Sequence, residues 1–365
     1  MELRKNHLEG LEILRFLTMV GVLFWHYQSF SYNNAYHLSD NFISTKQPFY
    51  DYFNFFYNYG VHGPEIFWCI SGFIFFYIYA DSASSNKITS KFFFLKRFAR
   101  LYPAHLVTLL IVCLLQVLIF KEQNNFYIYE YNNLKHFILQ FFFISSWGLE
   151  DGHSFNGPIW SVSLEIIVYI IFFIFIKNLK IVFAFILAAL LFFVFAKLNP
   201  ALASCLLLFF GGGYLSISKY NEKFRKAKNI FLKNLNLINI GVFSIISLSI
   251  ILHYCYPEKY YKIFPNRLIF MAIVLLFCNL DFFIKKLKLT SFFIFLGSLS
   301  YSGYLIHVPV QLLIYLISIY VGFEINYENN LLFFIFFIST ILLSYLSFKY
   351  LENPARKKIT NLLLR

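Results

Sequence analysis

Long apolar segments dominate this chain of 365 residues and limit what it can fold into. Runs such as IIVYIIFFIFI at 166–176 and LLFFIFFISTILLSYLSF at 331–348 belong to segments that reach the roughly 20 residues needed to cross a bilayer. Hydrophobic residues make up 59% of the chain and charged residues 13%, whereas soluble domains carry about 25% charged residues. One water-soluble core does not hold this much apolar surface, so we predict an all-α, polytopic membrane helix bundle.

The hydropathy pattern predicts about ten transmembrane helices. They lie near 11–30, 62–80, 101–120, 159–176, 181–196, 200–217, 236–253, 264–280, 296–320 and 330–350. Lys and Arg gather before the first span and after every second one, and the alternate segments hold few of them. Because basic residues near span ends are retained in the cytoplasm, both termini are predicted to be cytoplasmic.

The same topology places two long segments, 31–61 and 121–158, outside the membrane. Both are rich in Tyr, Phe and Asn, a composition that suits carbohydrate binding and also fits interfacial aromatic belts. We expect residues 1–352 to form one transmembrane domain and 353–365 a short basic cytoplasmic tail, with no separate soluble domain.

Other chemistries have little support in the sequence. The net charge of +13 is spread over short segments between apolar runs, so it does not form the basic face that nucleic acid requires. The five cysteines have no metal-binding spacing, and neither a phosphate-binding loop nor an H-E-x-x-H motif occurs. We therefore expect no metal and no nucleic-acid partner.

The first two spans carry ionisable side chains, which cost at least about 2.5–3.5 kcal/mol inside a membrane. Arg15 and His26 are eleven residues apart, a spacing that places them on one helix face at opposite depths. Pairing of Arg15 with Glu12 and an interfacial position for His26 are the structural alternatives. Glu65 begins the second span, where it either stabilises a protonated His26 or complements the helix dipole.

Two further groups of polar residues lie just before the third span and within the fourth. Arg97 and Arg100 are one helical turn apart on the predicted cytoplasmic side, where paired guanidinium groups bind phosphates or simply anchor the topology. In the fourth span, Ser161, Glu165 and Tyr169 lie on one stripe by their i, i+4 spacing. A buried glutamate has no structural role unless it is paired or protonated, so we favour a functional role.

The ninth span, LGSLSYSGYLIHVPV, aligns Ser300, Tyr304 and His307 on one side of a helix. His307 is predicted near the middle of the membrane, where a histidine bonded between helices is the structural alternative. In the second span, Ser71 and Gly72 are small residues of the kind that mark close helix packing.

Taken in order, these motifs resemble acyltransferase family 3, membrane proteins that include bacterial polysaccharide O-acetyltransferases. The resemblance runs through nearly the whole chain. It rests on Arg15 and His26, EIFWCISGF at 65–73, KRFARLYP at 96–103, WSVSLE at 160–165, LGSLSYSGYLIH at 296–307 and ENPAR at 352–356. Pro64 and Trp68-Cys69 depart from the residues that are more usual there.

The resemblance implies transfer of an acyl group, usually acetyl from cytoplasmic acetyl-CoA, to a hydroxyl of a cell-surface or lipid-linked glycan such as O-antigen or exopolysaccharide. The expected location is the bacterial cytoplasmic (inner) membrane. The resemblance also carries roles onto individual residues: essential roles onto Arg15 and His26, donor binding onto Arg97 and Arg100, and membership of the site onto Glu65, Ser71, Glu165 and His307.

We therefore expect His26 to act as a general base, with Glu65 or Glu165 stabilising its imidazolium, or to form an acyl-histidine intermediate. Arg15 joins the expected acyl-CoA site, and Ser161 and Tyr304 complete the set. The expected partners are acyl-CoA, a glycan or lipid-linked sugar, and membrane lipids. The alternative function is a transporter or flippase for a lipid-linked sugar, and a purely structural membrane subunit comes third.

Overall fold

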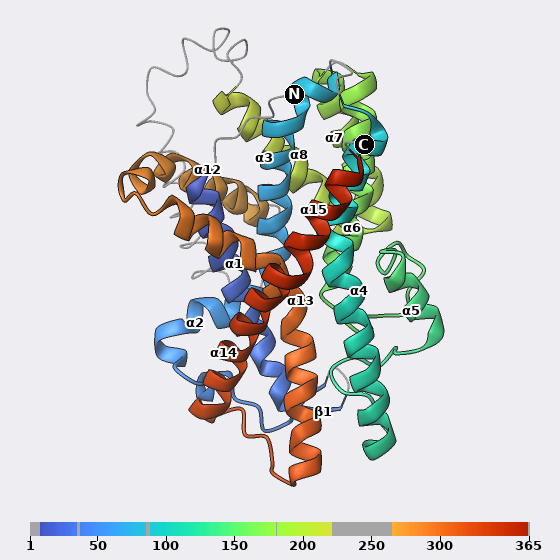
Figure 1. Cartoon of the computed structure of the whole chain (residues 1–365), viewed down its shortest axis with the longest axis vertical. Helices are drawn as coiled ribbons and strands as arrows, with labels where there is room; N and C mark the ends of the chain where they lie inside the picture. The colour runs from blue at the N-terminus through green and yellow to red at the C-terminus, as the bar shows by residue number, and fades with distance from the viewer. Residues whose placement is uncertain (1–7, 35–36, 85–87, 180, 221–264, 364–365) are drawn as a thin grey trace. The chain divides into compact units, whose positions relative to one another are not determined.

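The chain folds almost entirely into helices, as the apolar segments predict. The computed structural model describes residues 8–34, 37–84, 88–179, 181–220 and 265–363 (Figure 1). Within these ranges the β-structure is one antiparallel pair, β1 (Tyr32–Asn34) with β2 (His37–Leu38). The all-α class is confirmed.

Eight helical segments of the described chain are long and apolar enough to cross a membrane. They are Tyr50–Tyr79, Ser90–Gln123, Ile159–Asn178, Ile181–Leu198, Pro200–Tyr220, Arg267–Lys286, Thr290–Val321 and Asn330–Leu362. The first predicted span is the nineteen-residue helix α1 (Glu9–Tyr27), and the predicted span at 236–253 lies outside the described residues. The protein is a multi-pass membrane protein.

Three segments differ from the sequence prediction. Helix α4 (Ser90–Gln123) begins eleven residues before the predicted span, so Pro103 lies inside it and not in its first turn. Lys, Phe, Leu and Arg are compatible with an α-helix. Pro103 has no N–H and therefore removes only one backbone hydrogen bond from α4. The two predicted outer segments contain helices as well, α2 (Tyr50–Tyr59) and α5 (Leu134–Phe141).

The chain divides into two compact units. The first unit comprises Met1–Arg15, Pro64–Thr89 and Ile167–Gly297. It holds most of α3 (Gly63–Ser84) and of α6 (Ile159–Asn178), with α7 (Ile181–Leu198), α8 (Pro200–Tyr220) and α12 (Pro265–Lys286).

Close backbone contact between α3 and α8 organises the first unit. A Cβ atom added at Gly72 would collide with the Phe209 carbonyl, and one added at Gly212 would collide with the Cys69 carbonyl. Small residues allow helix backbones to approach in this way in membranes. The interpretation of Gly72 as a packing residue is confirmed. Helices α7 and α8 also pack together, as do α8 and α12.

The second unit comprises Phe16–Gly63, Ser90–Ile166 and Ser298–Arg365. Besides α2, α4, α5 and the strands, it holds the rest of α1, η1 (Gln28–Ser31), η2 (Ser44–Lys46), η3 (Gly60–His62), most of α13 (Thr290–Val321), α14 (Asn330–Ser347), the π-helix η4 (Phe348–Glu352) and α15 (Asn353–Leu363). The expected tail is thus mostly helix α15, which packs on α4 (Figure 1).

Helices α4 and α13 form a core of the second unit with the segment that follows α4. Leu109 and Val112 of α4 are buried in one cluster with Val308 and Leu312 of α13. The segment is tied to α4 by the fully buried Gln116, which donates to the Tyr127 carbonyl at 2.7 Å and accepts from the Tyr127 N–H at 3.2 Å. These contacts set α13 beside the segments that carry the candidate residues.

Candidate active site

One face of α13 carries a row of five polar or aromatic side chains, which we call the α13 row. Its members are Tyr301, Tyr304, His307, Gln311 and Tyr315. At 100° and 1.5 Å per residue, the row occupies a sector about 120° wide and extends over about 21 Å. Its members contact α4, α6, α1 and the segment after α4, all within the second unit.

The middle of the α13 row is a pair of histidines. The rings of His26 on α1 and His307 have centroids 4.6 Å apart. His307 is fully buried, and its Nδ1 lies 3.3 Å from the Gly303 carbonyl, which only accepts hydrogen bonds. This contact assigns the proton to Nδ1 and leaves the lone pair on Nε2. Nε2 has no hydrogen-bond partner in the described part of the chain, so a buried basic nitrogen adjoins His26.

Gln311 fixes the position of His26. The buried amide Nε2 of Gln311 donates to the His26 carbonyl at 2.6 Å. His26 is the last residue but one of α1, and the last four carbonyls of an α-helix have no partner inside it. Gln311 therefore joins the end of α1 to α13. Sequence reasoning missed this residue, whose signal is an amide in an apolar run one turn beyond His307.

A hydrogen-bonded group of hydroxyls lies one turn before His307. The Tyr304 hydroxyl donates to the Pro158 carbonyl at 2.9 Å and lies 2.8 Å from Ser161 Oγ. Ser161 also donates to the Pro158 carbonyl at 3.2 Å, so the two hydroxyls share one acceptor. Glu165, one turn further along α6, is buried and within electrostatic range of Tyr304. The structure thus brings Tyr304 of α13 together with Ser161 and Glu165 of α6.

Three arginines gather where α4, η4 and α15 meet, and we call them the arginine cluster. Arg97 and Arg100 of α4 lie within electrostatic range of Arg356 on α15. The buried carboxylate of Glu352 is near Arg100 and Arg356 and accepts a hydrogen bond from Ser302 on α13. One carboxylate among three guanidinium groups leaves net positive charge, which favours an anionic ligand.

Tyr301 connects the α13 row with the arginine cluster. Its hydroxyl donates to the Leu101 carbonyl at 2.7 Å, next to Arg100, and the ring is within electrostatic range of Glu352 and Arg100. Sequence reasoning assigned no role to Tyr301, Glu352 or Arg356. The available signal was a single acid just beyond the last apolar run, followed by an arginine one turn later.

Three predicted site residues belong to the first unit. Arg15 forms an ion pair with Glu12 at 3.0 Å, as its structural alternative requires. Glu65 stands half-buried in the first turn of α3, and Ser71 is half-buried beside the packing residue Gly72. Tyr169, predicted on the stripe of Ser161 and Glu165, also lies in this unit, where its ring stacks on Phe75 at 4.3 Å.

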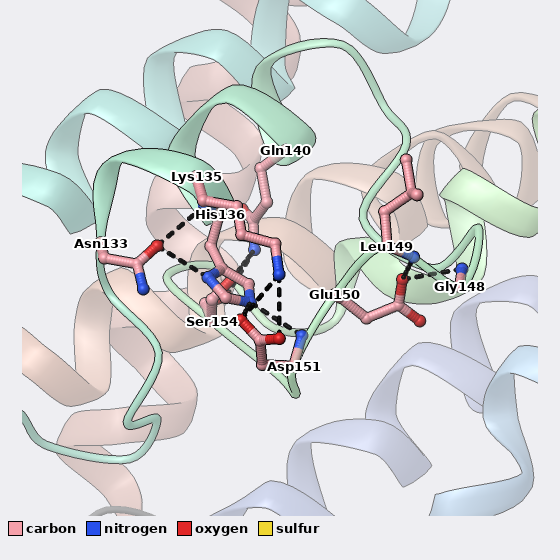
Figure 2. A network of polar contacts seen from close by, with 9 residues as sticks. All are labelled: Asn133, Lys135, His136, Gln140, Gly148, Leu149, Glu150, Asp151 and Ser154. Atoms are coloured by element: carbon pink, nitrogen blue, oxygen red, sulfur yellow. Dashed lines mark hydrogen bonds and ion pairs between the residues drawn. The ribbon is translucent and has the colours of Figure 1, made fainter.

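A polar network on α5 holds the segment that leads into α6 (Figure 2). The buried His136 accepts from the Asp151 N–H at 3.1 Å through Nε2, so its Nδ1 carries the proton and donates to Asn133 Oδ1 at 2.8 Å. Lys135 pairs with Asp151 at 2.8 Å and holds the pKa of that carboxyl below its ordinary value. Burial lowers the pKa of His136, despite the neighbouring Asp151.

The same segment reaches the histidine pair. The fully buried Asn156 donates from Nδ2 to the Leu305 carbonyl of α13 at 3.0 Å, and His153 lies within electrostatic range of His26. The Asn156 Oδ1 has no partner among the described residues. The segment 142–158 is thus fixed to both α5 and α13, and Asn156 is another site residue that the sequence analysis missed.

Comparison with known proteins gives a family match. Residues 8–349 match the family model described as an acyltransferase domain. No curated protein and no solved structure matches the chain.

Proposed function

Since the chain belongs to acyltransferase family 3 and is an acyltransferase, we propose that it moves an acetyl group from cytoplasmic acetyl-CoA to a hydroxyl of a cell-surface or lipid-linked glycan. We propose the bacterial inner membrane as its location. The α13 row carries the proposal, because it runs within one unit from the arginine cluster, suited to a phosphorylated donor, to a buried imidazole pair. Membership of an acyltransferase family favours this function over transport.

The donor binds at the arginine cluster. The phosphates of acetyl-CoA match guanidinium groups in charge and in hydrogen-bond geometry, which supports this role for Arg97, Arg100 and Arg356. The thioester arm then extends along the α13 row toward His26, past Tyr301 and Tyr304.

His26 acts as the general base. It accepts the proton of the acceptor hydroxyl while the hydroxyl oxygen attacks the thioester carbonyl carbon. The tetrahedral intermediate breaks its C–S bond, and the departing thiolate takes the proton from His26 and leaves as the thiol of coenzyme A. The contact with His307 and the Gln311 bond orient the imidazole.

The test is acyl transfer from labelled acetyl-CoA by the purified protein to polysaccharide from the host. General acid–base catalysis contributes about 10²- to 10⁴-fold, and we expect His26→Ala to lose that much. The matched control is His37→Ala, because His37 is exposed on β2. Wild-type transfer by His26→Ala would refute the proposed role. Acetyl esters should also disappear from the surface polysaccharide of cells that lack the gene.

A further inference from the structure

A cavity of about 540 Å³ lies within the second unit at the end of the α13 row. Its walls come from η1 and β1, from the segment after α4, and from the end of α13 with the residues that follow. The volume falls in the range of small-molecule sites, about 300–1,000 Å³. The predicted topology places this end of α13 on the outer side, opposite the arginine cluster.

The lining combines flat rings with hydrogen-bonding groups. Tyr127 and Tyr315 stack with ring centroids 3.7 Å apart and planes 7° from parallel, and Phe323 leaves 45% of its surface exposed. Gln123 and Glu324 add an exposed amide and carboxylate. Aromatic faces pack against the C–H faces of a sugar ring, and such polar groups bind its hydroxyls.

The charge of the cavity lining differs from that of the arginine cluster, so the two sites favour different ligands. Of the described residues that line the cavity, Glu324 carries the only charge, and none is Lys or Arg. A carboxylate repels the phosphates of acetyl-CoA, which the arginine cluster attracts. Serines and the amide among the rings also make the cavity more polar than a site for a lipid tail. A neutral, hydroxyl-rich ligand fits best.

Two elements lead from the cavity to the histidine pair. Phe30 and Ser31 of η1 lie four and five residues after His26, and Tyr315 lies eight residues after His307 on α13. At 1.5 Å per residue, His307 and Tyr315 are separated by about 12 Å along the helix. The Tyr127 hydroxyl donates to the Ser29 carbonyl at 2.7 Å, which ties the cavity wall to the end of α1. A single sugar in the cavity does not reach the histidines, but a chain of sugars does.

We propose that this cavity is a subsite for the sugar units that flank the acylated one, so that the acceptor is an oligosaccharide or polysaccharide and not a monosaccharide. The inference rests on the proposed glycan acyltransfer. The half-buried Tyr315, which is backed by the buried Tyr127, and the exposed Phe323 hold the flanking sugars by their faces, and Glu324 binds their hydroxyls. The acceptor hydroxyl then lies at His26.

The test uses the purified full-length chain and two probes: oligosaccharides released by mild acid from the host surface polysaccharide, and the monosaccharides of its complete hydrolysate. The variant is Phe323→Ala with Glu324→Gln, because both residues are exposed. The control is Glu130→Gln, an exposed acid outside the cavity. Calorimetry measures oligosaccharide binding without acetyl-CoA, and initial rates give KM for each substrate.

We expect the double variant to weaken oligosaccharide binding and raise its KM about tenfold, which corresponds to about 1.4 kcal/mol. The KM for acetyl-CoA and the slow reaction with monosaccharides should stay unchanged, as should all values for the control. Unchanged oligosaccharide binding in the double variant, or binding of phospholipid that competes with the oligosaccharide, overturns the subsite. Oligosaccharide binding that depends on the cavity, without any transfer by the wild type, supports the subsite and refutes the proposed function.

Discussion

Replacing Gln311 by leucine tests whether the end of α1 must be fixed for the reaction to proceed. The side chains are similar in size, but leucine does not donate the 2.6 Å hydrogen bond to the His26 carbonyl. Because Gln311 is fully buried, no water replaces the lost donor. Leaving a buried acceptor unpaired costs about 1–3 kcal/mol.

The activity loss follows from the same figure. Without this hydrogen bond His26 is no longer held beside His307, and we assign the whole free-energy cost to the activation free energy of acyl transfer. At 1.36 kcal/mol per factor of ten, kcat then falls about 5-fold to 150-fold. The KM for acetyl-CoA should not change, because the arginine cluster is untouched. Steady-state kinetics with labelled acetyl-CoA measures both values, and thermal unfolding measures stability.

Gln47→Leu is the matched control. Gln47 is also buried and donates to a backbone carbonyl, that of Ser44 at 3.2 Å. Both variants should lose stability, and Gln311→Leu alone should lose kcat. The reasoning is wrong if Gln311→Leu keeps its kcat, or if the two variants lose activity in proportion to their stability.

Three other changes test separate parts of the molecule. Arg97→Ala with Arg100→Ala should raise the KM for acetyl-CoA at least tenfold with little effect on folding. If equilibrium dialysis shows unchanged acetyl-CoA binding in this double variant, the two arginines only anchor the topology. Gly72→Leu should lower thermal stability by about 1–3 kcal/mol or more, because its side chain meets the Phe209 carbonyl; an unchanged melting temperature would contradict that contact. The pKa of His136 in the folded protein is below the ordinary histidine pKa of 6.5, so its neutral form stabilises 134–154 fully above pH 6.5. This stability is lost as the pH falls through the pKa that His136 has in the folded protein. Hydrogen exchange of that segment should accelerate on acidification, and His136→Gln should remove the dependence.

Local hydropathy made the spans predictable. Each span is a continuous apolar stretch, so its existence follows from composition without knowledge of its neighbours. Boundaries were less accurate where helices extend beyond the apolar run, as α4 does through Lys91, Lys96 and Arg97. Helices α2 and α5 were not predicted, because each is shorter than the roughly 11–18 residues over which a helical period is read.

The candidate site was predictable only in part. His26, Glu165 and His307 are conspicuous because ionisable residues are rare in spans. Gln311 and Asn156 carry no charge and gave no such signal, although both bind backbone carbonyls in the site. Glu352 and Arg356 sit at the end of the last apolar run, where basic residues are common for reasons of topology.

The sequence by itself determined that this chain crosses a membrane with helices, which polar residues those helices carry, and that it resembles acyltransferases. These properties depend on local hydropathy and on short motifs. Only the tertiary structure decided that His26 meets His307, that Ser161 meets Tyr304, and that Arg356 joins Arg97 and Arg100. Helical periodicity gives the face of a residue but not the partner of that face, because packing between distant segments sets helix rotation and depth.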